Sequence, residues 1–223
     1  KAVILSQFGF GATIDFDDVS HKGITNISTD DVAVAQELGY VIKLVGDVRE
    51  VESGISAEVS PTFLPKNHPL ASVNDVMNAV FVESIGIGES MYYGPGAGQK
   101  PTATSVLADI IRIARRLSDG NVGKPFNEFR RDLPLANPAD VKSNYYFALD
   151  TPDEKGKILH LSEIFNSEDI SFEQVLQQKA NGTTARIVVI THAMSKTQLK
   201  AVTEKLEAAE DFTVVNTLKV LSN

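Results

Sequence analysis

The sequence contains no cysteine among its 223 residues. It therefore offers no disulfide framework, no thiolate ligand for a metal and no cysteine nucleophile, which fits a reducing cytoplasm. It also lacks any apolar run of the roughly 18 residues that would span a bilayer. From these two absences we expect a cytoplasmic protein without a membrane partner.

Basic residues are few and dispersed. The chain has 21 lysines and arginines against 29 aspartates and glutamates, a formal net charge of −8, and no dense basic run. Nucleic acids bind proteins through concentrated positive charge, so we predict no nucleic-acid partner. The hydrophobic fraction of 43% is that of an ordinary globular protein, and the length allows one large or two small domains.

Two common catalytic signatures are also missing. The sequence has no Gly-x-Ser-x-Gly elbow of the kind that carries a serine nucleophile. Its four histidines show no paired ligand spacing, and we therefore predict no metal site. These histidines are His21, His68, His160 and His192.

What the sequence does contain is a glycine-rich stretch, YYGPGAGQKPTAT, from Tyr92 to Thr104. It follows two predicted strands, residues 78–84 and 89–93, and precedes a predicted helix. Glycines let the backbone approach a ligand closely, and the N–H groups at a helix start point toward it. The stretch matches neither standard phosphate motif, because Gln99 replaces the last glycine of the dinucleotide fingerprint and Gly-Lys-Ser/Thr is absent. The glycines alone fit a plain strand-to-helix turn equally well.

The predicted helix after this stretch is amphipathic. Its apolar residues recur at helical spacing on one face: Val106, Ile110, Ile113 and Leu117. We interpret the methionine and aromatic residues scattered through the chain as core.

The first half of the chain alternates helical and extended patterns. Residues 1–10 show an apolar helical pattern, and Ser28 precedes a second helix as an N-cap with acidic residues in the first turn. Residues 40–46 and 50–59 are predicted strands. The prolines that follow mark a predicted loop: Pro61, Pro65 and Pro69. This arrangement predicts an α+β fold in which a mixed sheet carries helices on one face.

Residues 118–143 hold glycines and prolines among charges, and we interpret them as a linker wrapped over a surface. Beyond them the predicted order is strand, helix, strand, strand, helix, strand. Asn181-Gly182 is its hairpin turn, and Ser195 caps its second helix. This order is typical of the ferredoxin-like βαββαβ fold. We therefore predict two domains, residues 1–140 and residues 141–223.

The second domain resembles an ACT domain, a small module that senses amino acids in biosynthetic enzymes. The stretch from Asp153 to Leu159 stands where that family has Asp-x-Pro-Gly-Val-Leu, and residues 187–192 match its central strand. The resemblance implies an effector amino acid held by the loop of Asp153, Gly156 and Ile158. Lys155 replaces the usual Pro and Lys157 the usual Val, which predicts weak effector binding.

The first domain resembles homoserine dehydrogenase. Four strings match in family order: KAVIL at residue 1, GYVIKL at residue 39, NAVFVE at residue 78, and the glycine stretch with its Pro101-Thr102-Ala103. The resemblance implies reduction of L-aspartate 4-semialdehyde to L-homoserine with NADH or NADPH, in threonine and methionine biosynthesis. Lys1 aligns with the family's catalytic lysine. Gly96, Ala97 and Gly98 align with its cofactor-contacting loop.

The same resemblance implies that most of the NAD(P)H contacts belong to a nucleotide-binding Rossmann domain upstream. This chain shows no trace of that domain, so we expect a fragment that is inactive on its own. An alternative is an amino-acid-sensing and oligomerisation module without catalysis. Both readings predict a homodimer or higher homo-oligomer, because ACT domains and homoserine dehydrogenases commonly pair through their sheets. The expected small-molecule partner is the substrate, aspartate semialdehyde or homoserine.

Overall fold

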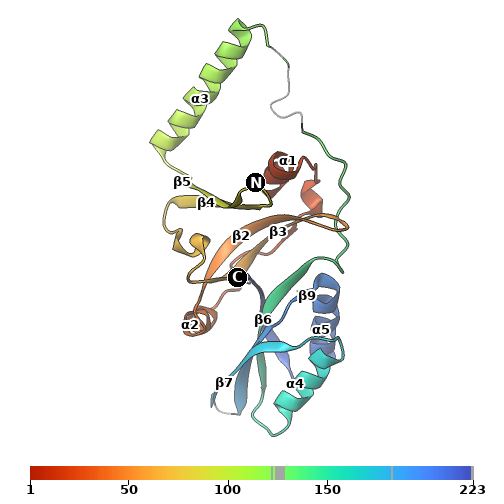
Figure 1. Ribbon diagram of the computed structural model, residues 1–223. Coiled ribbons are helices and arrows are strands. Elements are labelled where there is room, and N and C mark those ends of the chain that lie inside the picture. Colours follow the sequence, from red (N-terminus) through yellow and green to blue (C-terminus); the bar gives the residue numbers. More distant parts are fainter. Residues whose placement is uncertain (122, 124–128, 182, 222–223) are drawn as a thin grey trace. The chain divides into compact units, whose positions relative to one another are not determined.

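The computed structural model describes every residue except 122, 124–128, 182 and 222–223. Its contacts divide the chain into two compact units. Unit 1 comprises residues Lys1–Pro65 and Arg130–Asn223, and unit 2 comprises residues Lys66–Phe129. Figure 1 shows the ribbon of the chain, coloured along the sequence.

Unit 1 is built around one mixed sheet whose strands follow the order β1-β3-β10-β6-β8-β7, with β2 on the other side of β3 and β9 beside β6. The strands are β1 (Ser20–His21), β2 (Tyr40–Val51), β3 (Gly54–Pro65), β6 (Lys142–Pro152), β7 (Phe172–Asn181), β8 (Thr184–Thr191), β9 (Met194–Ser195) and β10 (Thr213–Val220). The helices are α1 (Ala2–Phe10), α2 (Thr29–Glu37), α4 (Lys157–Asn166) and α5 (Lys196–Ala208), with a 3-10 turn η1 at Phe16–Asp18. The predicted α+β class is confirmed.

The carboxyl-terminal part of this sheet has the predicted ferredoxin-like order. β6, α4, β7, β8, α5 and β10 follow one another, and β10-β6-β8-β7 pair antiparallel. Helices α4 and α5 cover one face, where Phe147, Leu161, Phe165 and Leu206 are fully buried. Ser195 caps α5 in a capping box with Gln198, which satisfies two helix-end N–H groups. The predicted hairpin turn at Asn181-Gly182 lies partly outside the described residues, because Gly182 is not described.

The opposite face of the same strands is covered by α2, which the sequence did not lead us to expect. Val34 and Ala35 of α2 are 1% exposed and pack in one cluster with Tyr146, Val188 and residues of β10. α2 therefore lies on the other side of the sheet from α4 and α5 (Figure 1). The ferredoxin-like part thus has helices on both faces, α4 and α5 on one and α2 on the other.

The sheet also runs past the predicted domain boundary at residue 140. β10 pairs parallel with β3 through Lys219↔Thr62 and Val220↔Phe63, so strands from both predicted domains share one hydrogen-bonded sheet. A ring stack of Phe63 on Tyr146, with centroids 4.4 Å apart, joins the same two parts. The division into two domains, residues 1–140 and residues 141–223, stays a prediction.

A buried cluster of charges lies where β10 meets β3. Lys219, 6% exposed, contacts the carboxylates of both Asp47 and Glu58. Lys196, at the start of α5, pairs with the second oxygen of Glu58 at 2.7 Å. The two lysines hold the pKa of Glu58 at about 2, against the burial that would raise it. Ion pairs thus connect the β2–β3 hairpin to α5 and β10, in addition to the apolar packing between these parts.

The stretch after residue 130 follows the β2–β3 hairpin, as the predicted linker over a surface would. Arg131 makes a bidentate ion pair with Glu50 at 2.7 Å for each bond. Ile55 donates its N–H to the carbonyl of Pro134 at 2.9 Å. Gly54, at φ +143°, allows this approach, because a Cβ there would lie 2.1 Å from the Pro134 oxygen.

The predicted limits of the first two long strands were wrong. The sequence predicts one strand over residues 50–59, but Val51 ends β2 and Gly54 begins β3, and the two strands pair as a hairpin. Pro61 and Pro65, placed in a loop, lie in β3. Pro61 is tolerated because β3 pairs with β1 at residues 58–59 and with β10 at residues 62–63, leaving residue 61 between these two contacts.

Unit 2 holds a two-stranded sheet followed by a long helix. β4 (Met77–Ser84) and β5 (Gly88–Pro95) pair antiparallel from Met77↔Pro95 to Ser84↔Gly88, as the sequence predicts. A 3-10 turn, η2 (Pro69–Ser72), precedes them, and α3 (Gln99–Ser118) follows. The glycine stretch occupies the junction between β5 and α3.

The apolar stripe of α3 is present, as predicted, and it is not buried. Val106, Ile110, Ile113 and Leu117 are 53–58% exposed. Tyr92 and Tyr93 of β5 are also exposed, at 72% and 52%. A hairpin and one helix cannot cover all of their own apolar faces, because each face needs a second layer.

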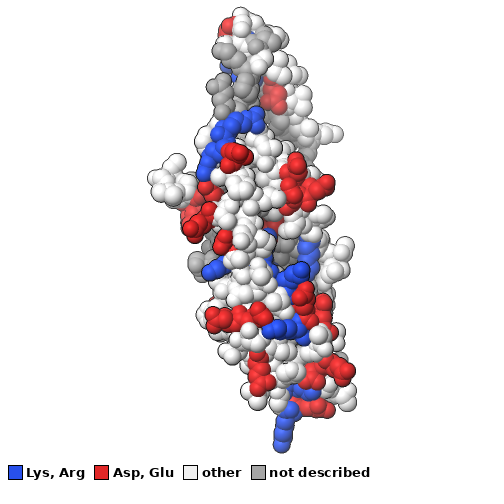
Figure 2. All heavy atoms as spheres, turned by 90° about the vertical axis from the view of Figure 1, so that its right-hand side faces the viewer, with Lys and Arg blue, Asp and Glu red and all other residues white. Residues whose placement is uncertain are grey.

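The distribution of charge on the surface and the character of the helices bear on possible nucleic-acid and membrane partners. Figure 2 shows acidic and basic side chains interspersed on the face that it draws, without a continuous basic area. Within the described residues, none of the helices combines the length and the apolar character needed to cross a bilayer.

Candidate functional site

The glycine loop, defined here as Pro95–Gly98, joins β5 to α3. Gly98 is the N-cap residue of α3 at φ +121°, an angle that favours glycine, and it gives α3 no side-chain cap. The first N–H groups of any helix lack intrahelical acceptors, so they remain available to a ligand. Ala97 is exposed between the two glycines.

Gly96 does not have a positive φ, and its close neighbour is the exposed side chain of Asn78. The Gly96 N–H donates to the carbonyl of Val76 at 3.1 Å, which ties the loop to the residue before β4. A Cβ at residue 96 would lie 1.9 Å from Nδ2 of Asn78. The predicted residues Gly96, Ala97 and Gly98 thus lie together in one turn at a helix start.

Lys1 belongs to unit 1, whereas the glycine loop belongs to unit 2. Lys1 is the N-cap residue of α1, and its carbonyl accepts from the N–H of Leu5 at 2.9 Å. Its side chain is exposed and makes no hydrogen bond or ion pair with the residues that the structure describes. The ammonium group is therefore available to a substrate.

The three predicted effector residues come together at the start of α4. Asp153, Gly156 and Ile158 line a hollow of about 320 Å³ that Gln177 and Ile187 complete from the sheet. Gly156 is the N-cap of α4 at φ +91°. Thr151, 2% exposed, also lines the hollow, and its buried hydroxyl has no hydrogen-bond partner among the described residues. The hollow thus combines helix-start N–H groups with an unused hydroxyl.

The two lysines of this loop behave differently. Lys157 pairs with Asp211 at 3.1 Å and with Glu154 at 3.4 Å, and the bond to Asp211 raises its pKa. Its charge is therefore already engaged by two carboxylates. Lys155 is exposed and adds its charge at the rim.

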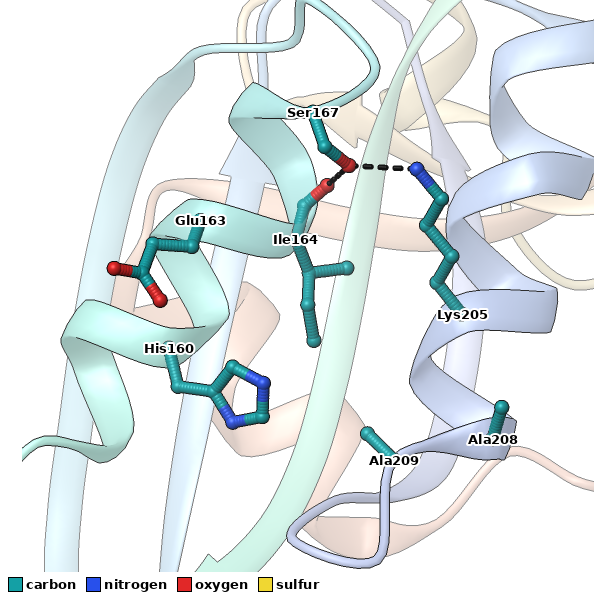
Figure 3. Close-up of a pocket in the computed structure, with 7 residues that line it drawn as sticks. All are labelled: His160, Glu163, Ile164, Ser167, Lys205, Ala208 and Ala209. Carbon is teal, nitrogen blue, oxygen red and sulfur yellow. Dashed lines mark hydrogen bonds between the residues drawn. The ribbon is translucent and has the colours of Figure 1, made fainter.

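A second hollow, of about 460 Å³, lies between α4 and α5 on the outer side of the sheet (Figure 3). Lys205 donates to the Ser167 hydroxyl at 2.7 Å and pairs with Glu168 at 2.5 Å. Ser167 in turn donates to the Ile164 carbonyl at 2.6 Å. These groups satisfy one another and tie the two helices together, so we assign the hollow no ligand.

The described residues hold no group of three or more His, Asp or Glu side chains placed to bind a metal ion. Sequence reasoning missed two residues of the candidate sites, Asn78 beside Gly96 and Thr151 in the hollow at α4. Asn78 opens the NAVFVE string, but its place beside Gly96 is recognised only from strand register, and Thr151 is recognised only from its burial.

Comparisons with known proteins bear on the family of this chain. A family model described as homoserine dehydrogenase matches residues 1–111. A homoserine dehydrogenase of Lactococcus lactis is 58% identical over 223 residues, covering 100% of this chain and 52% of that protein. One of Corynebacterium glutamicum is 36% identical, covering 98% of this chain and 50% of that protein.

A solved structure gives the same result. The crystal structure of a homoserine dehydrogenase from Thiobacillus denitrificans has a TM-score of 0.90 and 30% identity, covering 100% of this chain and 52% of that chain. All of these relatives are dehydrogenases by name. The chain belongs to the homoserine dehydrogenase family. It spans about half the length of the relatives that it matches.

Proposed function

We propose that this chain is part of an NAD(P)H-dependent homoserine dehydrogenase, an oxidoreductase that reduces L-aspartate 4-semialdehyde to L-homoserine in threonine and methionine biosynthesis. The observation that supports this most is the 58% identity to the Lactococcus relative along the whole chain. The glycine loop at the start of α3 and the free ammonium of Lys1 are the chemical groups that this reaction would use.

In the proposed reaction, the nicotinamide supplies hydride to the aldehyde carbon. The Lys1 ammonium lies at the aldehyde oxygen, stabilises the negative charge that develops there and delivers the proton that completes the alcohol.

The cofactor is proposed to contact Gly96, Ala97 and Gly98 while most of its binding energy comes from a nucleotide-binding domain outside these residues. The exposed stripe of α3 supports this view, because four apolar side chains along one helix face are normally covered by another layer. Unit 2 is then the part of the enzyme that meets that domain.

A homodimer or larger homo-oligomer remains our proposal for the assembly. β2 and β7 are the outer strands of the unit 1 sheet, and unpaired strand edges favour pairing with a second copy. α2 already covers one face of the ferredoxin-like part, so pairing through an edge is favoured over pairing through that face.

The hollow at α4 is proposed as an effector site with weak affinity for threonine. Its helix-start N–H groups suit a carboxylate, and Lys155 would repel an α-amino group. Lys155 in place of proline also leaves the loop more freedom to lose on binding.

Calorimetry with threonine and the whole chain tests this site. We expect a dissociation constant weaker than about 1 mM, which corresponds to roughly 4 kcal/mol of binding free energy. Micromolar affinity that disappears in Gly156→Val but persists in the control Gly86→Val would contradict the prediction of weak binding.

Turnover tests the proposed activity. The purified chain, assayed with homoserine and NAD(P)+, is expected to give no turnover above background. The enzyme encoded with its natural upstream region is expected to turn over at the roughly 1–10³ per second that is usual for enzymes. A full-length enzyme that folds and does not oxidise homoserine would remove the proposed function, and it would leave the alternative of a sensing and oligomerisation module.

A further inference from the structure

Asn78 lies directly against the glycine loop. It is the second residue of β4 and pairs with Gly94 across the hairpin, two residues before Gly96. Its Nδ2 donates to the carbonyl of Val76 at 3.3 Å, the same oxygen that accepts from the Gly96 N–H at 3.1 Å. The Val76 carbonyl oxygen thus accepts hydrogen bonds from both the loop and the Asn78 side chain.

The Asn78 carboxamide occupies the space beside Gly96. A Cβ at residue 96 would lie 1.9 Å from its Nδ2, 2.3 Å from its Cγ and 2.9 Å from its Oδ1. Gly96 is not among the glycines with positive φ, so its backbone angle would admit other residues. A side chain at residue 96 would therefore require either the exposed Asn78 carboxamide or the loop itself to move.

We propose that Asn78 is a positioning residue of the glycine loop. Its carboxamide and the Gly96 backbone fit against each other, and this contact fixes the path of the chain two residues before the N-cap Gly98. Through Gly98 it fixes the direction of the first N–H groups of α3. The consequence for cofactor binding rests on the proposed function, whereas the contact itself does not.

The neighbouring glycine provides a matched control. Gly94 stands two residues earlier on the same strand, and a Cβ there would meet no atom within 4 Å. Gly94→Ala and Gly96→Ala are the same chemical change with opposite steric consequences. If Asn78 is the cause, then Asn78→Ala must relieve the defect of Gly96→Ala.

The first measurement is amide hydrogen exchange at residue 96 in the whole chain, which needs no cofactor. We expect Gly96→Ala to lower the protection factor about tenfold or more, because the loop must move off Val76, and Gly94→Ala to change it less than about threefold. The double variant Asn78→Ala/Gly96→Ala should return to within about threefold of Asn78→Ala alone. Equal protection in Gly94→Ala and Gly96→Ala, or no recovery in the double variant, would overturn the proposal.

The second measurement is the KM for NADPH and kcat in the full-length enzyme with the same variants. Gly96→Ala should raise KM or lower kcat by roughly 10- to 100-fold, since small displacements of positioning groups cost that much, and Asn78→Ala should recover part of it. If the exchange pattern holds while KM and kcat stay unchanged, the contact is real but its role in the reaction is refuted. If the unsubstituted enzyme has no dehydrogenase activity, the proposed function fails and the exchange result stands.

Discussion

Replacing Lys1 by alanine in the full-length enzyme is expected to lower kcat by roughly 10²–10⁴-fold, the usual contribution of a positioned general acid. The reason is the unpartnered ammonium of Lys1, which the proposed mechanism places at the aldehyde oxygen. Alanine removes both the charge that stabilises the alkoxide and the proton that neutralises it. The fold should be unaffected, because the Lys1 side chain is exposed and makes no polar contact with the described residues.

Lys200 supplies the matched control for this variant. It lies on α5 with 80% of its side chain exposed, and its one ion pair, to Glu204, spans 3.9 Å. Lys200→Ala removes the same group from the same unit and should leave kcat within about twofold, as surface substitutions cost under ~0.5 kcal/mol. Steady-state kinetics and thermal melts of both variants decide the matter. A Lys1→Ala enzyme that keeps kcat within a few-fold of the parent removes Lys1 from the mechanism.

Replacing Lys219 by methionine is expected to destabilise the chain by about 3 kcal/mol, the lower end of the cost of breaking a buried ion pair. The variant leaves Asp47 and the buried Glu58 without their shared cation. Lys196 still neutralises one oxygen of Glu58, which is why the lower end applies. Urea denaturation at pH 7 measures the free energy of unfolding. A loss below about 0.5 kcal/mol, the scale of a surface substitution, would show that the cluster contributes no net stability.

The same cluster predicts a dependence on acid. The pKa of Glu58 is about 2 in the folded chain, well below the ordinary 4.5 of a glutamate. A folded pKa below the unfolded one stabilises the fold above pH 4.5, and that stabilisation is lost as the pH falls from 4.5 toward 2. Glu58→Gln should therefore show a weaker loss of stability over this range than the parent. Parallel curves for the two proteins would mean that Glu58 does not titrate with this shift.

Local sequence signals predicted most of the helices and strands. Ser28 and Ser195 cap α2 and α5 as expected, because an N-cap serine and the residue three positions on form a contact that needs no tertiary information. The prolines Pro61 and Pro65 misled the prediction. A proline argues against a strand only where both edges of that strand are paired, and at residues 61 and 65 β3 pairs with β2 alone. The pairing of β10 with β3 was not predictable, because no local pattern connects residues 62 and 219.

Among the candidate site residues, too, those with a local sequence signal were predicted and those that depend on tertiary structure were not. Gly98 was identified from its place between a strand and a helix, and its positive φ is the angle that a glycine there indicates. Asn78 was not identified, because its role depends on the register that sets it against Gly94 and Gly96. The apolar stripe of α3 shows most clearly what the sequence pattern cannot predict. Periodicity predicts which face of a helix is apolar, but it does not tell whether the same chain supplies the layer that covers it.

The central claim is that this chain supplies the glycine loop and Lys1 but depends on residues outside it for the nucleotide. Titration of NADPH into the purified chain and into the full-length enzyme, followed by calorimetry under the same conditions, tests it directly. We expect no saturable binding to the chain, and micromolar binding, about 8 kcal/mol, to the full-length enzyme. Micromolar binding of NADPH to the isolated chain would contradict the account.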